Sequence, residues 1–194
     1  LVDFIQKKFD FPLHNIELVR QHVGNGIRKL IIRSIPDGED NPRFEEVYQE
    51  FLDYYQKNCQ VKTRAYDGIM ELLKELHESN IKMAIVSNKA HAAVDELNEI
   101  YFKDYIKVAI GENEAAGIKK KPAPDSVFHA LKLLGSKKEE AVYVGDSEVD
   151  RATAENAGMD CVLCSWGFRE RELLEGLKPI AIIDEPKDLL KIIK

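Results

Sequence analysis

Apolar residues in the first third of the chain recur with helical spacing. The segments at 16–23, 26–35 and 44–58 carry apolar side chains at the intervals of an amphipathic helix. They are separated by "FPLHN", "GNG" and "PDGEDNP", which combine the residue types that favour turns. Residues 1–62 are therefore predicted to form a small helical domain without strands.

From about residue 64 the pattern becomes an alternation of amphipathic helices and short apolar runs rich in β-branched residues. The runs predicted to be strands lie at 81–86, 105–110, 141–144, 161–164 and 180–183. Strands that alternate with helices form parallel sheets with helices on both faces. The chain is therefore predicted to be an α/β protein with a parallel-sheet core at 63–194.

Polar residues follow two of the predicted strands at the point where each strand ends. Ser87 and Asn88 follow the run at 81–86, and Asp146 follows the run at 141–144. In an open α/β sheet the carboxyl ends of the strands form the crevice where ligands bind. We therefore expect these side chains to lie at one ligand site.

The residue types at these ends suit phosphate chemistry. The Ser87 hydroxyl can donate to an oxyanion, and Lys121 can neutralise phosphate charge. Asp146 offers a hard oxygen ligand for Mg²⁺, and Asp150 or Glu148 can ligate the metal or hold a water bound to it. Together these groups predict a site for Mg²⁺-assisted phosphoryl transfer.

Each of these residues also has an ordinary structural interpretation. Ser87 could cap a helix, Lys121 could be one more solvated lysine, and Asp146 and Asp150 could stabilise the first turn of a helix. Their occurrence in order, at successive strand ends, favours a functional site over three separate coincidences.

Composition narrows the classes of partner and environment. With 28 basic and 34 acidic residues the formal net charge is −6, which argues against a nucleic-acid partner. No apolar run approaches the roughly 20 residues of a membrane helix. Three cysteines without a secretory signal favour the cytoplasm and no structural disulfide. Cys161 and Cys164 have CxxC spacing but no second pair to complete a zinc site, so we expect them to be buried strand residues.

Three segments carry a resemblance to a known family. "VSNK" at 86–89, "KPAPD" at 121–125 and "VYVGDSEVDRATAENAGM" at 142–159 resemble the second, third and fourth motifs of the haloacid dehalogenase-like phosphohydrolases. "VRQHVGNGIRKLI" at 19–31 and "SWGFR" at 165–169 look most like the phosphoglycolate phosphatases of that family. The resemblance implies a helical cap over a Rossmann-like core.

The resemblance also implies a role for each matching residue. Ser87 would bind the transferring phosphoryl group, Asn88 would help to orient it, and Lys121 would bridge it to the nucleophile. Asp146 would be the Mg²⁺ ligand, and Asp150 would support the metal site.

In the cap, the resemblance implies that the turn of Gly24, Asn25 and Gly26 faces the substrate. The expected partner is a small phosphorylated molecule, and the expected assembly is a monomer or a homodimer.

The first motif of the family, an apolar strand that ends in Asp-x-Asp-Gly-Thr, does not occur in the 194 residues. It supplies the aspartate nucleophile and the general acid, so we expect roughly twenty further residues ahead of this chain. In the family's strand order the missing strand lies between the strands that carry Ser87 and Asp146. Without it those strands would leave unpaired backbone groups, and the chain alone should have little turnover.

Several alternatives stay open at this point. A sugar-phosphate mutase or a pyrophosphatase of the same family would share the core. A non-catalytic phosphate-sensing module would keep the anion site without the nucleophile. A response-regulator-like domain is a weaker alternative, because it predicts no helical segment before the sheet.

Overall fold

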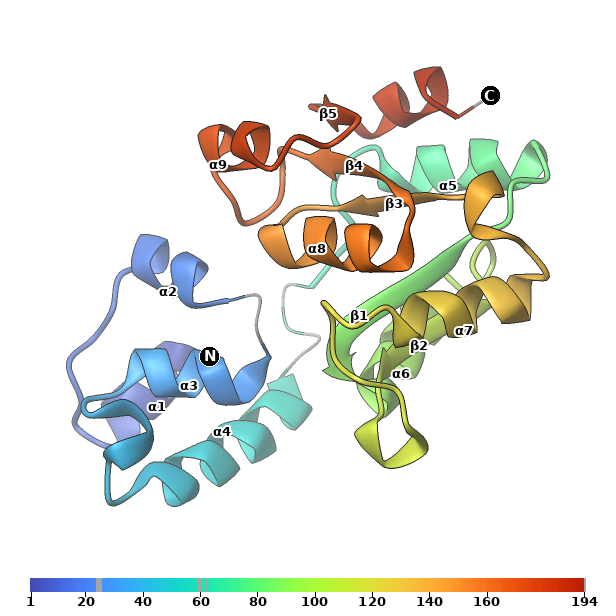
Figure 1. Ribbon diagram of the computed structural model, residues 1–194. Coiled ribbons are helices and arrows are strands. Elements are labelled where there is room, and N and C mark those ends of the chain that lie inside the picture. Colours follow the sequence, from blue (N-terminus) through green and yellow to red (C-terminus); the bar gives the residue numbers. More distant parts are fainter. Residues whose placement is uncertain (24–25, 59–60, 62, 194) are drawn as a thin grey trace. The chain divides into compact units, whose positions relative to one another are not determined.

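The protein is described by a computed structural model over residues 1–23, 26–58, 61 and 63–193, and it divides into two compact units (Figure 1). The units are Leu1–Arg64 and Ala65–Lys194. Each unit has its own hydrophobic core, so each is described by itself.

The secondary structure of unit Leu1–Arg64 consists of helices within its described residues. Its helices are α1 (Val2–Lys8), α2 (Ile16–His22), α3 (Ile27–Ser34), a 3₁₀ turn η1 (Gly38–Asp40) and α4 (Phe44–Asn58). These helices bury one apolar cluster made by Val2, Ile5, Phe9, Ile31, Ile35, Phe44, Val47 and Phe51. A buried hydrogen bond accompanies the cluster, because Gln6 Nε2 donates to the carbonyl of Ser34 at 2.8 Å. The helical prediction for this segment is confirmed.

The helices of unit Ala65–Lys194 are amphipathic and alternate with its strands, as the sequence pattern predicts. They are α5 (Ile69–Glu78), α6 (His91–Tyr101), α7 (Asp125–Leu134), α8 (Glu148–Ala157) and α9 (Arg171–Gly176), with 3₁₀ turns at η2 (Glu114–Ala116), η3 (Lys138–Glu140) and η4 (Pro186–Lys191). Helix α5 is an example of this amphipathic pattern. Its buried Leu72 and Leu76 pack in a core cluster that also contains residues of the sheet, whereas the glutamates of the same helix are exposed.

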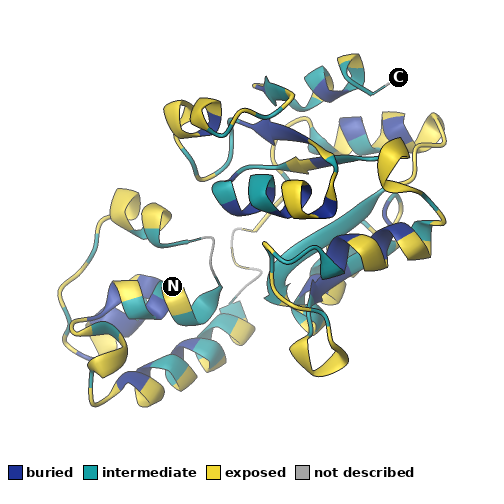
Figure 2. Cartoon of the chain, viewed as in Figure 1, coloured by how far each residue is buried: buried dark blue, intermediate teal, exposed yellow. Residues whose placement is uncertain are grey.

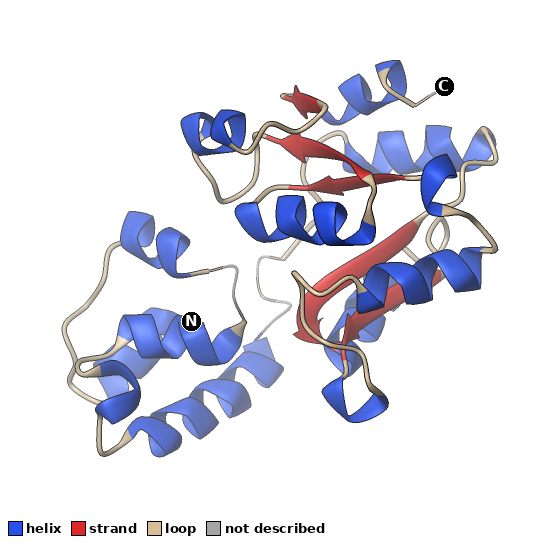
Figure 3. Ribbon diagram, viewed as in Figure 1, coloured by secondary structure: helices blue, strands red, loops and turns tan. Residues whose placement is uncertain are grey.

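The strands of this unit are all parallel to their neighbours, and they form two separate sheets. One sheet pairs β1 (Ala84–Ala90) with β2 (Val108–Glu112). The other has the order β3 (Val142–Gly145), β4 (Asp160–Cys164) and β5 (Ala181–Ile183). Helices α6 and α7 pack on the first sheet and α8 packs on the second (Figure 3). The predicted α/β class with parallel strands is confirmed.

Within the described residues β1 and β3 are not paired with each other. The strand order of the resembled family implies an additional strand between these two, and that strand stays a prediction.

The first two strands differ most from the sequence prediction. The second strand begins at Val108 instead of 105, because the N–H groups of Tyr105 and Ile106 both donate to the carbonyl of Phe102 and prolong the end of α6. The first strand begins at Ala84 and continues to Ala90, so the polar residues after "AIV" still belong to it.

Strand β4 is the most buried strand of the unit, as Figure 2 shows. Its alternate residues enter two different clusters, with Cys161 and Leu163 on one face and Val162 and Cys164 on the other. Both thiols are free, and burial raises the pKa of each to about 12. The two cysteines therefore point to opposite faces, and the prediction of buried strand residues is confirmed.

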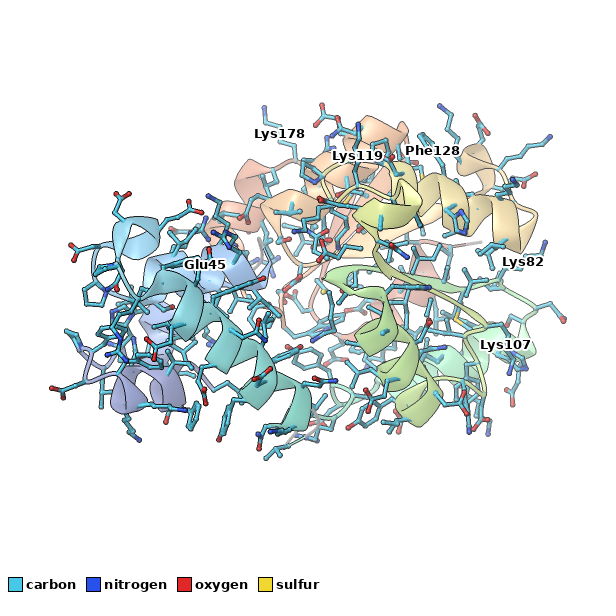
Figure 4. All side chains as sticks on the ribbon, turned by 90° about the horizontal axis from the view of Figure 1, so that it is seen from below. Glu45, Lys82, Lys107, Lys119, Phe128 and Lys178 are labelled. Carbon is cyan, nitrogen blue, oxygen red and sulfur yellow. The ribbon has the colours of Figure 1, made fainter. Side chains whose placement is uncertain are left out.

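Two exposed lysines of this unit illustrate its surface. Lys82, labelled in Figure 4, donates to the carbonyl of Leu134 at 2.8 Å and closes the end of α7. Lys119 projects outward in the same view and is exposed. Among the described helices, none is long and apolar enough to cross a membrane.

Candidate active site

The end of β1 is irregular where it carries the polar residues. Between Val86 and Ala90 the strand advances four residues while β2 advances two, from Ile110 to Glu112. Gly111 permits this close approach, because a Cβ at that position would lie 2.5 Å from the carbonyl oxygen of Lys89. The bulged end exposes its side chains to the next loop in place of a regular ladder.

The side chain of Asn88, in this bulged end, forms hydrogen bonds with the main chain of Lys121. Its Nδ2 donates to the carbonyl of Lys121 at 3.1 Å, and its Oδ1 accepts the N–H of Lys121 at 2.7 Å. Both ends of the amide are therefore committed to the backbone of one residue. Asn88 fixes where the Lys121 side chain starts.

The ammonium of Lys121 reaches from β1 to α8. Its Nζ lies 2.7 Å from Asp150 Oδ1, 3.2 Å from the Tyr143 hydroxyl and 3.4 Å from the carbonyl oxygen of Val86. The Lys121 side chain is 13% exposed and that of Asp150 is 8% exposed, so the pair is largely shielded from water. Ser87 lies between Val86 and Asn88, the two residues of β1 that bond Lys121, and its hydroxyl accepts the N–H of Lys89.

Asp150 is the centre of this network. Its Oδ1 accepts from Lys121 and from the Tyr143 hydroxyl at 3.1 Å, and its Oδ2 accepts from Ser147 Oγ at 2.6 Å and from the N–H of Asp146 at 3.1 Å. Burial opposes the charged form, but the Lys121 charge and these donors outweigh it and hold the Asp150 pKa below its usual value. Burial, reinforced by the Asp150 charge, raises the pKa of Tyr143, which therefore stays a hydroxyl donor.

Asp146 occupies the turn between β3 and α8, beside Asp150. Its Oδ2 accepts the N–H of Phe168 at 2.9 Å, and no partner for its Oδ1 exists among the residues that the structure describes. Burial raises the pKa of Asp146, and the neighbouring Asp150 charge raises it further, although the Phe168 N–H opposes the shift. One oxygen of the Asp146 carboxylate therefore accepts a backbone hydrogen bond, and the other oxygen is available to a ligand.

Two glycines make room for the two carboxylates. A Cβ at Gly145 would lie 2.3 Å from Cβ of Asp150, and a Cβ at Gly167 would lie 2.2 Å from Oδ2 of Asp146. Any side chain at either position would displace an acid group, because neither contact can relax by moving a flexible chain end alone.

Glu148 has a different role from its acidic neighbours. Arg169 donates two hydrogen bonds to Glu148, from Nε to Oε2 at 2.7 Å and from Nη2 to Oε1 at 2.8 Å. The arginine side chain is only 10% exposed, and its guanidinium lowers the Glu148 pKa. The pair joins the start of α8 to the loop after β4, which includes the Phe168 N–H bonded to Asp146.

The structure brings the predicted core residues together. The hydrogen bonds described above join Asn88, Lys121, Asp146 and Asp150. Ser87 precedes Asn88 in β1, and its described hydrogen bond is to the N–H of Lys89. In the helical unit, Gly26 precedes α3 with a φ of 84° and no atom within 4 Å of an added Cβ. Gly24 and Asn25 lie outside the described residues.

Sequence reasoning missed the groups that hold these residues in place. Tyr143, Ser147, Gly145 and Gly167 carry no charge, and only Ser147 has a signal, since a serine three residues before Asp150 at a helix start is a cap. The glycines could not be found from the sequence, because their function is to avoid contacts made by distant residues.

The acidic groups are too few to cage a metal ion alone. Across the described part of the chain, no three His, Cys, Asp or Glu side chains form a cluster that could hold a metal. Mg²⁺ in phosphoryl-transfer sites is bound by one or two carboxylates, with waters and the substrate completing its shell. The available Oδ1 of Asp146 fits that requirement, whereas all four donors to Asp150 compete with a metal for its oxygens.

The chain is similar to known proteins over most of its length. The profile of the haloacid dehalogenase-like hydrolases matches residues 3–164. Phosphoglycolate phosphatase 1 of Pseudomonas aeruginosa is 30% identical over 97% of this chain and 71% of its own length. A Caldanaerobacter subterraneus protein regarded as a pyrophosphatase is 35% identical over 78% of this chain and 69% of its own length.

A solved structure shares the same fold. It is a Lactobacillus delbrueckii protein regarded as a phosphoglycolate phosphatase, with a TM-score of 0.91 and 30% identity. The match covers 99% of this chain and 89% of that one.

Proposed function

Because the chain belongs to the haloacid dehalogenase-like hydrolase family, we propose that it is a Mg²⁺-dependent phosphatase that hydrolyses a small phosphate monoester of the phosphoglycolate type. The observation that carries the proposal is the meeting of Lys121 and Asp146 around Asp150 at the strand ends. A fixed cation beside a carboxylate with one available oxygen provides for both a phosphate anion and a metal ion.

In this proposal Asp146 holds the metal and Asp150 supports the site without ligating it. The commitment of both Asp150 oxygens to protein donors supports that division. When bound, Mg²⁺ neutralises charge on the phosphoryl oxygens and orients them. Glu148 keeps the loop after β4 in place through Arg169.

The remaining residues bind and orient the phosphoryl group. Ser87 donates its hydroxyl to a phosphoryl oxygen, and Lys121 donates a hydrogen bond to the same group while it keeps its contact with Asp150. Asn88 acts through Lys121, since both ends of its amide are bonded to that residue's backbone. In this way Asn88 helps to orient the phosphoryl group through Lys121.

The nucleophile is an aspartate outside these 194 residues, in a strand that ends in Asp-x-Asp-Gly-Thr. Its carboxylate attacks phosphorus, the ester oxygen leaves, and water then hydrolyses the phosphoaspartate. The separate pairing of β1 with β2 and of β3 with β4 supports the place of that strand, between the two sheets. The helical unit serves as the cap in this proposal.

The test is phosphate release by a chain extended at its N-terminus with that strand. We expect Mg²⁺-dependent hydrolysis of p-nitrophenyl phosphate, lost by at least a hundredfold in Asp146→Asn and retained in the exposed control Asp160→Asn. Full activity of Asp146→Asn would refute the metal role. The 194-residue chain without the extension should release no phosphate above background.

Pyrophosphate hydrolysis is the second candidate, because the relative regarded as a pyrophosphatase reaches 35% identity. A panel of phosphoglycolate, pyrophosphate and a sugar phosphate, assayed on the extended chain, separates the two and also reports mutase activity. If no ester is hydrolysed but phosphate still binds, the chain is a phosphate-sensing module.

A further inference from the structure

A cavity of about 540 Å³ lies within the unit Ala65–Lys194, and its lining includes none of the residues assigned to the proposed active site. It is lined by the start of α5, the loop after β4 and the segment that joins β5 to η4. This volume is in the range of small-molecule sites in proteins.

The walls of the cavity combine aromatic and aliphatic surface. Tyr66 and Trp166 supply rings, and Leu72 and Leu190 supply aliphatic side chains that belong to the core cluster beneath. The wall is held in place where Gly68, with a φ of 81°, approaches Pro186, since an added Cβ there would lie 3.4 Å from Pro186 Cγ. The lining is therefore built from packed elements of the core.

The rim of the same cavity is strongly acidic. Its charged lining consists of the carboxylates Asp67, Glu71, Glu75, Asp184 and Glu185 and the ammonium of Lys187. Lys187 is already paired with Glu185 at 2.7 Å, and Asp184 accepts from Ser165 Oγ at 2.6 Å and pairs with Arg171. Local cations therefore neutralise only part of the rim.

Glu71 and Glu75 are the carboxylates that remain for a ligand. They stand one turn apart on α5, both line the cavity, and neither side chain has an ion-pair partner among the described residues. Like charges at this spacing repel each other, so a ligand cation between them would remove an unfavourable interaction.

We propose that this cavity binds a linear aliphatic diamine. Its methylenes would pack on the aliphatic and aromatic walls, one ammonium would meet Glu71 and Glu75, and the rings of Tyr66 and Trp166 would stabilise the charge at close range. A neutral molecule of the same length gains only the apolar contact, and an anion is repelled by the rim. The proposal does not depend on the proposed phosphatase activity.

The chain contains a single tryptophan, and Trp166 lies in the cavity wall, so its fluorescence reports occupancy directly. The full chain is titrated with 1,5-diaminopentane, with pentane-1,5-diol and with glutarate at constant ionic strength. We expect a saturable change in emission with the diamine and none with the diol or glutarate. Absence of a saturable response to the diamine, or an equal response to the diol, would overturn the proposal.

Matched variants separate site binding from general attraction to an acidic protein. Glu71→Gln combined with Glu75→Gln should weaken diamine binding about fivefold to tenfold, since exposed ion pairs are individually weak. Glu78→Gln, on the same helix but outside the cavity, should stay within about twofold. Equal weakening by the control would show non-specific attraction and contradict the site. Isothermal titration calorimetry, with circular dichroism to establish folding, repeats the measurement without the fluorophore.

Discussion

Asp150 is a buried carboxylate with four hydrogen-bond donors, and Asp146, four residues earlier, has one backbone donor in the described structure. The two acids share a sequence motif but not an environment. Lys121 and its fellow donors keep Asp150 charged, while burial acts against the charge on Asp146. The two acids therefore have opposite effects on stability.

We predict opposite signs for the amide substitutions of these acids. Asp150→Asn leaves the shielded Lys121 ammonium without its counter-charge and should lower the free energy of unfolding by about 3–5 kcal/mol. Asp146→Asn removes a carboxylate that burial penalises and should raise it by up to about 1 kcal/mol. Urea unfolding at neutral pH measures both, and a loss of stability in Asp146→Asn would contradict the assignment.

The same pair predicts the direction of the pH dependence. The folded-state pKa of Asp150 is lowered, so its contribution is complete above the unfolded value near about 4 and is lost as the pH falls through the folded value. The stability difference between the wild type and Asp150→Asn should therefore shrink below about pH 4. A difference that stayed constant to lower pH would exclude the ionised carboxylate as its source.

Gly167 carries a prediction about the metal site. In Gly167→Ala the new Cβ would lie 2.2 Å from Asp146 Oδ2, so the carboxylate must move away from the Phe168 N–H. We expect Mg²⁺ affinity to fall about tenfold or more, as when an outer partner of a metal ligand is lost. Gly176→Ala is the control, because an added Cβ there has no atom within 4 Å, and calorimetric titration with Mg²⁺ compares the two. Unchanged affinity in Gly167→Ala would show that Asp146 does not hold the metal.

At the scale of single residues, the sequence predicted the charged residues of the site but not the uncharged residues that contact them. Lys121, Asp146 and Asp150 could be predicted because they occur in order after successive strands, where an open α/β sheet binds its ligands. Tyr143 and Gly167 could not, since a tyrosine in an apolar run and a glycine in a loop are ordinary until the fold sets them beside a carboxylate.

At the scale of elements, helix α8 starts from the site and depends on it. Ser147 is its N-cap: the hydroxyl accepts the N–H of Asp150 at 3.4 Å and donates to Asp150 Oδ2 at 2.6 Å. One side chain thus satisfies the helix start and helps to hold the central carboxylate. The buried face of α8, with Val149, Ala154 and Ala157, then packs the helix on the sheet.

Ser147→Ala should destabilise the chain by about 2 kcal/mol, because it removes a helix cap and a hydrogen bond to a buried carboxylate. Ser79→Ala, at an exposed position beyond the end of α5, should change stability by less than about 0.5 kcal/mol. Chemical unfolding of both variants provides the comparison. An effect of Ser147→Ala as small as that of the control would mean that the cap is not used.

Element positions were more predictable than element ends. The strands were found from apolar runs and the helices from their stripes, because both periodicities are local properties. The ends of β1 and β2 differ from the predicted ends because of contacts that the sequence does not show. One example is the pair of hydrogen bonds from the N–H groups of Tyr105 and Ile106 to the carbonyl of Phe102. The bulged end of β1, which presents Asn88 to Lys121, is a consequence of Gly111 in the neighbouring strand.

At the scale of the whole chain, two units carry separate cores. The cluster around Phe51 lies wholly within Leu1–Arg64, and the clusters around β4 lie wholly within Ala65–Lys194. The change in sequence pattern near residue 64 anticipates this division, since a domain border is where the periodicity of apolar residues changes. A chain with two cores need not unfold in one step.

We therefore predict that a core substitution in one unit leaves the unfolding of the other in place. Phe51 is 1% exposed, and Phe51→Ala should cost about 3–5 kcal/mol in the helical unit. Because the single tryptophan is Trp166, tryptophan emission reports only Ala65–Lys194, whereas far-ultraviolet circular dichroism reports both units. The dichroism transition of the variant should acquire an early phase at low urea, while the midpoint of the fluorescence transition should stay unchanged.

Phe128→Ala is the matched control for that experiment. Phe128 is 47% exposed at the surface of α7, where Figure 4 labels it, so its loss should shift neither transition by more than about 0.5 kcal/mol. If Phe51→Ala moved the tryptophan transition as far as the dichroism transition, the two cores would unfold as one cooperative block. The prediction that the helical unit unfolds independently would then be wrong.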